Sequence, residues 1–296
     1  AFFEHIRKRW CMGREDLYNA VLDRFAHMIQ MPWVKMGSWL VLRGTERCGK
    51  GMILQIVAEV LGTDYFFQPS SEDSIFGQFN EGMTNCLMLF MDEMVWGGEK
   101  RKAGVLKKLI TEPYVYINRK HMPLEKVANC CNGFMASNES WVVPAGTTDQ
   151  RYQVLDVDGE LATMPRPESR AIIQDVHSID RHALARFFYE RDISGFDHRR
   201  VINTEGLRYQ KIQGMSKVRK WWHDALTDGS MEIGGRQVEI GEWMAKDGVF
   251  QAYKDYSSDS HMVKSQFAKD LAEIATIDGV KKGRVGSKRV RMIKFV

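Results

Sequence analysis

The sequence predicts an α/β fold with three layers, in which helices cover both faces of a parallel sheet. Four short apolar segments, at 39–42, 87–91, 133–137 and 152–157, are typical of strands buried on both faces, because such strands carry continuous rather than alternating apolar residues. Helical patterns alternate with these segments, and that alternation indicates a parallel sheet. A chain of 296 residues, 44% of them apolar, is long enough for such a core with one or two smaller parts.

The chain is expected to begin with a small helical segment at 1–32. Apolar residues recur at helical spacing across 15–30, which predicts a helix with one face on a core, and Pro32 ends it. The first strand, at 39–42, lies between glycines, and a loop joins it to a helix at 52–61. A strand, a loop and a helix in this order are the start of a parallel α/β unit.

The α/β core is expected to span 33–205. Beyond the second strand its other elements are a helix at 100–111, hairpin strands at 114–118 and 124–127, a linker at Met164-Pro165-Arg166-Pro167 and one long helix at 168–191. The prolines of the linker interrupt the helical pattern there. In the sequence the hairpin lies between the second and third strands.

The last part, 206–296, is predicted to be a winged-helix-like domain that binds DNA or mediates contacts. Three short helical patterns precede an alternating basic strand, at 216–226, 241–256, 262–274 and 288–295. In such domains a helix and the wing meet DNA. Seven Lys or Arg and no acid between 279 and 296 add local positive charge, although a solvated terminus would have the same composition.

The overall composition indicates a reduced, intracellular protein without a membrane span. No run of eighteen apolar residues is present. The five cysteines form neither a CxxC pair nor an evenly spaced framework, which argues against a zinc site and a disulfide scaffold. Net charge is only +4, so it says little about partners. Because the chain starts without Met and without a signal peptide, we expect a piece of a longer protein.

The loop at 44–51 has the composition of a phosphate-binding loop. Its residues are Gly44, Thr45, Glu46, Arg47, Cys48, Gly49, Lys50 and Gly51. Backbone N–H groups and the helix N-terminus would face the phosphates of ATP, and Lys50 would reach the β- and γ-phosphates. The next residue is Gly51 rather than the Ser or Thr whose hydroxyl usually holds Mg²⁺. The metal would then depend on another ligand, or the loop is not a working site.

Two carboxylates follow the second apolar strand, Asp92 and Glu93. Acids at the end of a buried strand are costly unless a cation lies nearby. We expect Asp92 to hold Mg²⁺, directly or through water, and Glu93 to polarise the water that attacks the γ-phosphate. The alternative is a strand-end turn with two solvated acids.

Two further polar residues complete the candidate ATP site. Asn138 ends the third strand, where its amide could orient the attacking water, although such residues often only cap a turn. Arg151 begins the fourth strand and could stabilise transition-state charge across a subunit boundary. A surface salt bridge is the alternative for Arg151.

The order and spacing of these elements resemble the superfamily 3 helicases of viruses, phages and plasmids, which are hexameric AAA+ motors. Residues 115–121 and 134–138 are similar to the corresponding region of papillomavirus replicative helicases. In that family a Lys-His pair at a hairpin tip grips single-stranded DNA in the ring channel. The resemblance implies this role for the basic tip Arg119-Lys120-His121, which would otherwise be a solvated turn.

The same layout also resembles the phage and poxvirus primase-helicase branch of this superfamily, over roughly 33–157. That resemblance implies an AAA+ core, ATP and Mg²⁺ as cofactors, and a hexameric ring that unwinds forked duplex DNA with 3′–5′ polarity. It also implies a primase or polymerase domain upstream. Gly51 departs from the commoner hydroxyl residue, which puts the metal ligands in doubt more than ATP binding.

Two other functions are compatible with a phosphate-binding loop. An ATP-switched DNA-binding or origin-loading protein would use ATP to order an assembly without unwinding DNA. A small-molecule phosphotransferase would also bind ATP through such a loop. The basic hairpin between Asp92-Glu93 and Asn138 favours the helicase over the switch, and Arg151 with the basic C-terminal part disfavours the phosphotransferase.

Overall fold

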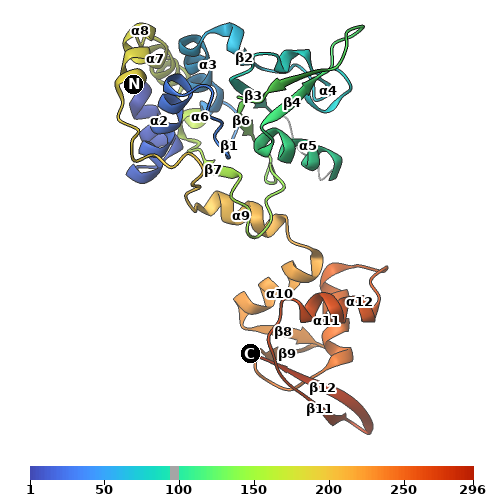
Figure 1. Cartoon of the computed structure of the whole chain (residues 1–296). Coiled ribbons are helices and arrows are strands. Elements are labelled where there is room, and N and C mark those ends of the chain that lie inside the picture. The colour runs from blue at the N-terminus through green and yellow to red at the C-terminus, as the bar shows by residue number, and fades with distance from the viewer. Residues whose placement is uncertain (94–99) are drawn as a thin grey trace. The chain divides into compact units, whose positions relative to one another are not determined.

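The computed structural model describes residues 1–93 and 100–296, which form two compact units, Ala1–Lys211 and Ile212–Val296 (Figure 1). Each unit has its own hydrophobic core. The boundary lies after the 205/206 position expected from the sequence because helix α9 (Glu205–Gln213) packs mostly on the first unit. Its Leu207 is buried in the core of that unit, and the Gln210 side chain accepts hydrogen bonds from the N–H groups of Val142 and Val143.

The first unit contains a five-stranded sheet with the order β2-β3-β6-β1-β7, in which every neighbouring pair is parallel. The strands are β1 (Trp39–Arg43), β2 (Phe66–Phe67), β3 (Met88–Asp92), β6 (Asn132–Ser137) and β7 (Tyr152–Asp156). The four longer strands match the four apolar segments of the sequence, so the prediction of a parallel α/β sheet is confirmed. Only the two-residue edge strand β2 was not anticipated.

Alternate residues of each strand point to opposite faces of the sheet, and each face carries a core of its own. Leu40 and Leu42 of β1 belong to one core, and Trp39 and Val41 belong to the other. Helices α2 (Glu15–Gln30), α3 (Lys50–Leu61) and α8 (Arg181–Glu190) contribute to the first core and α5 (Lys100–Thr111) to the second. Figure 1 shows α2 and α3 on one side of the sheet and α5 on the other.

The segment after β7 contains two helices rather than the single helix expected at 168–191. They are α7 (Arg166–His177) and α8, and the prediction of one helix is therefore wrong. Asp180 causes the break, because its carboxylate accepts hydrogen bonds from the backbone N–H groups of His182 and Ala183 and so caps a new helix. The expected linker is also shorter, since Arg166 and Pro167 form the first turn of α7, where proline is tolerated.

The remaining elements of the first unit are short. They are α1 (Phe2–His5), the π-helical segment Ile6–Trp10, α4 (Asp73–Phe76), α6 (Glu160–Thr163), the 3₁₀ turns Thr63–Tyr65 and Glu81–Met83, and the antiparallel hairpin β4 (Tyr114–Ile117) and β5 (Glu125–Ala128). The outer edge of β7 is covered by a loop: the Gln153 side chain exchanges two hydrogen bonds with the backbone of Ile202, and the Thr204 hydroxyl donates to the Val154 carbonyl.

The second unit consists of three helices, a three-stranded antiparallel sheet of order β10-β12-β11, and a separate hairpin. Its elements are α10 (Lys217–Asp228), β8 (Ser230–Ile233), β9 (Arg236–Glu239), β10 (Met244–Ala245), α11 (Lys246–Ser257), α12 (Lys264–Ala272), β11 (Ile277–Val285) and β12 (Lys288–Phe295). Aromatic residues dominate its core, among them Trp221, Trp222, Tyr253, Phe267 and Phe295. Strands β8, β9 and β11 were not predicted. No helix in 1–93 or 100–296 is long and apolar enough to cross a membrane.

Candidate functional site

The 44–51 loop joins the carboxyl end of β1 to the first turn of α3. The Gly44 N–H donates to the Ser137 carbonyl at 3.1 Å, which ties the loop to the end of β6. A Cβ on Gly44 would lie 2.9 Å from the Val157 carbonyl oxygen, so the loop passes too close to β7 for any other residue. Gly49 has φ 87°, in the left-handed region that favours glycine. Both glycines are therefore required by the path of the loop.

Lys50 is the first residue of α3, and only 8% of it is exposed. Its Nζ donates hydrogen bonds to the carbonyl oxygens of Gly44 and Thr45, each at 2.7 Å. The ammonium group thus lies inside the curve of the loop, at a helix N-terminus whose dipole favours anions. A cation and a helix N-terminus together suit a phosphate.

The order of the strands brings the other candidate residues beside this loop. Strand β6 lies between β1 and β3, and parallel strands end at the same edge of a sheet. Asp92 ends β3, and the Glu93 N–H donates to the Ala136 carbonyl of β6 at 2.8 Å. Asn138 follows β6, and its amide donates to Glu46 Oε1 in the loop at 3.4 Å. The loop, the two acids and Asn138 therefore lie together at the carboxyl ends of the parallel strands.

The electrostatics of Asp92 indicate a place for a cation. Partial burial raises the pKa of the Asp92 carboxyl, the negative charge of Glu93 raises it further, and the charge of Lys50 opposes both. Glu93 has φ 53°, an unusual backbone conformation for a residue with a side chain. Across 1–93 and 100–296, no three His, Cys, Asp or Glu side chains gather to hold a metal alone. Mg²⁺ usually needs only one or two carboxylates, with phosphate and water, so Asp92 and Glu93 fit it.

The structure has room for a Ser or Thr in place of Gly51. A Cβ there would lie 3.4 Å from Cζ of Phe90, which is ordinary contact. The packing of the loop therefore does not explain why this position carries glycine.

Arg151 lies at the amino-terminal ends of the strands, opposite to the carboxyl ends where these residues lie. Its carbonyl accepts the N–H of Trp39, the first residue of β1, whereas the loop follows the last residue of that strand. The five residues of β1 separate the two ends of the strand by roughly 17 Å, at about 3.3 Å per residue. The Arg151 Nε donates to Oδ1 of Asp149 at 2.9 Å, and the side chain of Asp149 is only 2% exposed. Arg151 therefore cannot reach a nucleotide bound at its own loop.

The basic tip of the β4–β5 hairpin divides into one fixed residue and two free ones. Arg119 is held within the first unit, where its guanidinium donates to Glu125 at 2.8 Å and to the Thr84 hydroxyl at 3.2 Å. Lys120 and His121 are exposed, and no ion pair to another described residue holds either side chain. His121 has φ 63° and makes the turn. Only Lys120 and His121 are available to meet a ligand.

Sequence reasoning missed the contact of the N-terminal helices with the loop. A Cβ on Gly49 would lie 2.6 Å from Cε1 of His5, whose ring is 4% exposed. The Arg9 guanidinium pairs with Asp158 and Glu160, which follow β7. His5 and Gly49 meet only through tertiary packing, so no local pattern in the sequence could have revealed their contact.

His5 should make the stability of the first unit depend on pH. Burial lowers the pKa of His5 to about 4, against 6.5 when exposed, and a hydrogen bond with the Gly49 backbone only partly opposes this. Between those values the unfolded chain binds a proton that the folded chain does not, so the free energy of unfolding falls as pH falls. His5 accounts for about 2 kcal/mol of this loss between about pH 7 and pH 5, and His27, whose pKa burial also lowers to about 4, adds to the total. Urea unfolding at both pH values measures it.

A His5→Gln variant should lose that part of the pH dependence, because Gln does not titrate. The exposed His261 offers a matched control, and His261→Gln should leave the dependence unchanged. An identical pH dependence in His5→Gln and the wild type would contradict the buried, neutral state of His5.

Comparison with known proteins relates part of this chain to a phage protein. A family described as a family of unknown function (DUF5906) matches residues 42–151, which include the loop, both acids, the hairpin and Arg151. A DNA primase-polymerase of Nitratiruptor phage NrS-1 is 27% identical over 153 residues. Half of this chain is homologous to part of that phage protein. The aligned part is 51% of this chain and 20% of the relative, so the chain spans only a small share of the relative's length.

Two solved structures of the C-terminal region of NrS-1 share the fold. One, an apo structure, has a TM-score of 0.69, and another, the A form, has a TM-score of 0.72. Each is 15% identical in sequence, and the alignment covers 100% of this chain and 75% of the other. At this identity the likeness shows the fold alone.

Proposed function

We propose that this chain is an ATP-hydrolysing motor that moves along DNA and unwinds it during phage DNA replication. One observation carries the proposal: the 44–51 loop with Lys50, the Asp92-Glu93 pair and Asn138 lie at the same edge of one parallel sheet. This is the set of groups that ATP hydrolysis needs, namely a phosphate cradle, carboxylates for a metal and a base, and an amide for the water.

Each group at this edge has a separate task in the proposed reaction. The N–H groups of the loop and the Lys50 ammonium bind the phosphates. To do so, Lys50 replaces its hydrogen bonds to the carbonyls of Gly44 and Thr45 with hydrogen bonds to phosphate oxygens. Asp92 holds Mg²⁺, which when bound neutralises the charge of the β- and γ-phosphates. Glu93 accepts a proton from the attacking water, and Asn138 orients that water.

The β4–β5 hairpin is the proposed contact with single-stranded DNA. Lys120 and His121 are free at its tip, and Glu125 holds Arg119 so that the tip keeps its shape. A lysine meets a phosphate without reading sequence, as a translocating protein requires. The relation to a phage DNA primase-polymerase supports a role on DNA in replication.

We also propose a hexameric ring as the working form, with forked duplex DNA as substrate. Arg151 lies roughly one strand length from its own loop, so a role in hydrolysis requires the loop of a neighbouring subunit. A closed ring supplies every loop with such a neighbour. The second unit fits the winged-helix-like part of this proposal through its three helices and terminal antiparallel strands.

A forked-duplex unwinding assay tests this function. Lys120→Ala should retain ATP hydrolysis and lose unwinding, because the change removes the grip on DNA and leaves the nucleotide site intact. Lys126→Ala is a matched control, since Lys126 lies in the same hairpin but packs over the Tyr114 ring, 4.1 Å from its centroid. The control should unwind like the wild type.

One outcome would reject the hairpin assignment, and another would reject the helicase. If Lys120→Ala unwinds as fast as the wild type, the hairpin is not the DNA grip. If the wild-type chain hydrolyses ATP and binds DNA but separates no strands, the alternative of an ATP-switched DNA-binding protein replaces the motor.

A further inference from the structure

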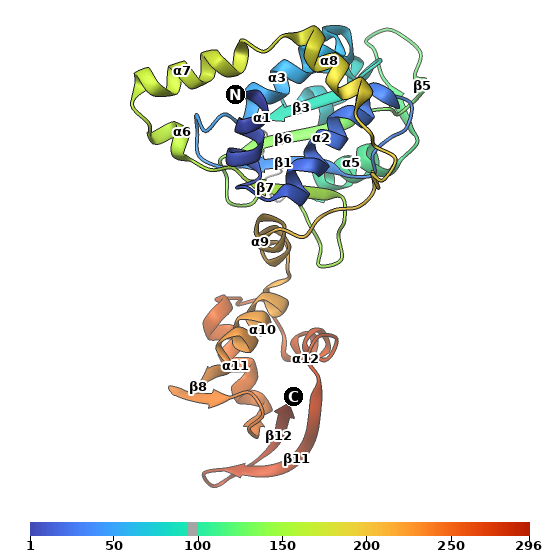
Figure 2. The same cartoon turned by 90° about the vertical axis from the view of Figure 1, so that its left-hand side faces the viewer.

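The β11–β12 hairpin of the second unit carries a row of cations that packing does not explain. Its two long strands are joined by a tight turn at Gly286, whose φ of 58° favours glycine at that position (Figure 2). Near the base, Ile293 and Phe295 are buried in the core of the unit. Farther along β12, the same face carries Arg291 and Arg289, because alternate residues share a face. The face that is apolar at the base thus becomes cationic towards the turn.

Strand pairing places cations directly opposite one another on this face. Lys282 pairs with Arg291, and Arg284 pairs with Arg289. Side chains in such pairs approach to about 5 Å between Cβ atoms, and like charges at that distance are destabilising. All four are exposed, and none forms an ion pair with any residue of the described parts of the chain.

The other face of the same hairpin is different. Lys281 stacks over the Trp243 ring, with Nζ 4.0 Å from its centroid, and Lys294 pairs with Asp278 at 2.8 Å. Two of the cations on that face therefore have partners inside the protein. The paired cations on the first face have no such partners, so an external anion would relieve their mutual repulsion.

We infer that the face formed by Lys282, Arg284, Arg289 and Arg291 binds the phosphate backbone of duplex nucleic acid. Successive cations on one strand are roughly 7 Å apart, two residues at about 3.4 Å each, so the face offers a regular row of charges to a regular row of phosphates. A two-stranded ribbon also fits the width of a major groove. Single strands are usually held by stacking on aromatic rings, and the exposed part of this face carries none, since its Phe295 is buried.

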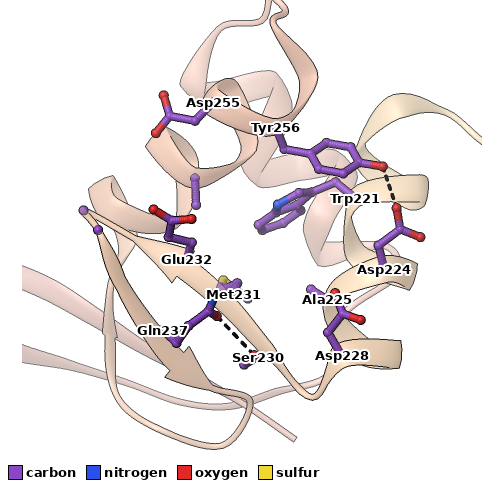
Figure 3. Close-up of a pocket in the computed structure, with 13 residues that line it drawn as sticks. Trp221, Asp224, Ala225, Asp228, Ser230, Met231, Glu232, Gln237, Asp255 and Tyr256 are labelled. Atoms are coloured by element: carbon purple, nitrogen blue, oxygen red, sulfur yellow. Dashed lines mark hydrogen bonds between the residues drawn. The ribbon is translucent and has the colours of Figure 1, made fainter.

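One side of the second unit disfavours duplex binding. A cavity of about 570 Å³ lies between α10, α11 and the β8–β9 hairpin, with Trp221 among its lining residues (Figure 3). Four carboxylates also line it, Asp224, Asp228, Glu232 and Asp255. Their charge repels phosphates, so a duplex approaches the hairpin and avoids this side of the unit.

Binding of a labelled short duplex to the whole chain, followed by fluorescence anisotropy without ATP, tests this site. Arg284→Ala combined with Arg289→Ala should weaken duplex binding on the order of tenfold and reduce the slope of log affinity against log salt by about 2. The control is Arg219→Ala combined with Arg236→Ala, which removes the same charge from the same unit. Both residues are exposed and lie outside the β11–β12 hairpin. It should bind like the wild type.

A second measurement separates binding from structure. Loss of one like-charge pair should leave the melting temperature unchanged or raised, whereas residues needed for folding would lower it. Lys50→Ala, which removes the proposed ATP site, should bind duplex normally, so failure of the motor and failure of the hairpin are distinguishable. Equal salt slopes in the hairpin variant and its control would overturn the inference. A single strand bound in preference to the duplex, through the same two arginines, would do so as well.

Discussion

Replacing Glu93 by Gln should reduce ATP hydrolysis by about 10²–10⁴-fold, the usual contribution of a general base, while nucleotide binding is kept. The substitution removes only the ability to accept a proton. Glu93 follows directly on β3, its N–H is fixed to Ala136 of β6, and its charge already raises the pKa of Asp92. The proposed base is thus fixed at the same end of the strands as Lys50, the proposed phosphate ligand.

Steady-state phosphate release with and without single-stranded DNA measures this effect, and a fluorescent ATP analogue reports binding. Glu81→Gln is the matched control, because Glu81 is exposed in a 3₁₀ turn of the same unit and carries the same functional group. It should hydrolyse ATP at the wild-type rate. Hydrolysis by Glu93→Gln within a factor of two or so of the wild type would show that Glu93 is not the general base, and this part of the proposed mechanism would fail.

Replacing Arg151 by Ala should lower hydrolysis even further, by about 10³–10⁵-fold, the range known for arginines supplied to a neighbouring phosphate site. The distance between the two ends of the strands rules out direct contact of Arg151 with the subunit's own nucleotide. Asp149, almost fully buried, orients the guanidinium by two hydrogen bonds, so little conformational entropy is lost when it meets a phosphate. On the proposed mechanism, Arg151 acts only in an assembly.

Mixed assemblies test that arrangement directly. Arg151→Ala subunits retain an intact loop, and Lys50→Ala subunits retain an intact arginine, so some interfaces of a mixed ring combine both. Hydrolysis should rise above either variant alone as the two are mixed. If no ratio restores any activity, Arg151 acts within its own subunit through Asp149, as a structural ion pair.

The sequence predicted the sheet well because four strands are buried on both faces. Strands of that kind are continuous apolar runs, and β1, β3, β6 and β7 all have this signature. Strand β11 lacks this signature because glycines and lysines interrupt its apolar residues. Only its partner β12 has a recognisable alternating pattern. The break between α7 and α8 was missed because the apolar spacing continues across it, and only the cap at Asp180 reveals it.

The candidate site was predictable in its residues and only partly in its geometry. A loop between a strand and a helix, and acids after a strand, can be recognised from local order. Which strands are neighbours cannot, and it is the placement of β6 between β1 and β3 that brings Asn138 beside Glu46. The contact of His5 with Gly49 depends in the same way on packing between distant segments.

Both edges of the sheet in the first unit are closed to further strands. Strand β2 has only two residues, and the backbone of Ile202 with the Thr204 hydroxyl covers β7. A sheet with long open edges would let copies of the chain join by strand addition, without limit and without a fixed angle. Here any association of first units has to use side chains and loops, whose shape can set one angle and so close a ring of defined size. Such contacts can also separate and re-form as nucleotide binds and leaves, which a continuous hydrogen-bonded sheet would not allow.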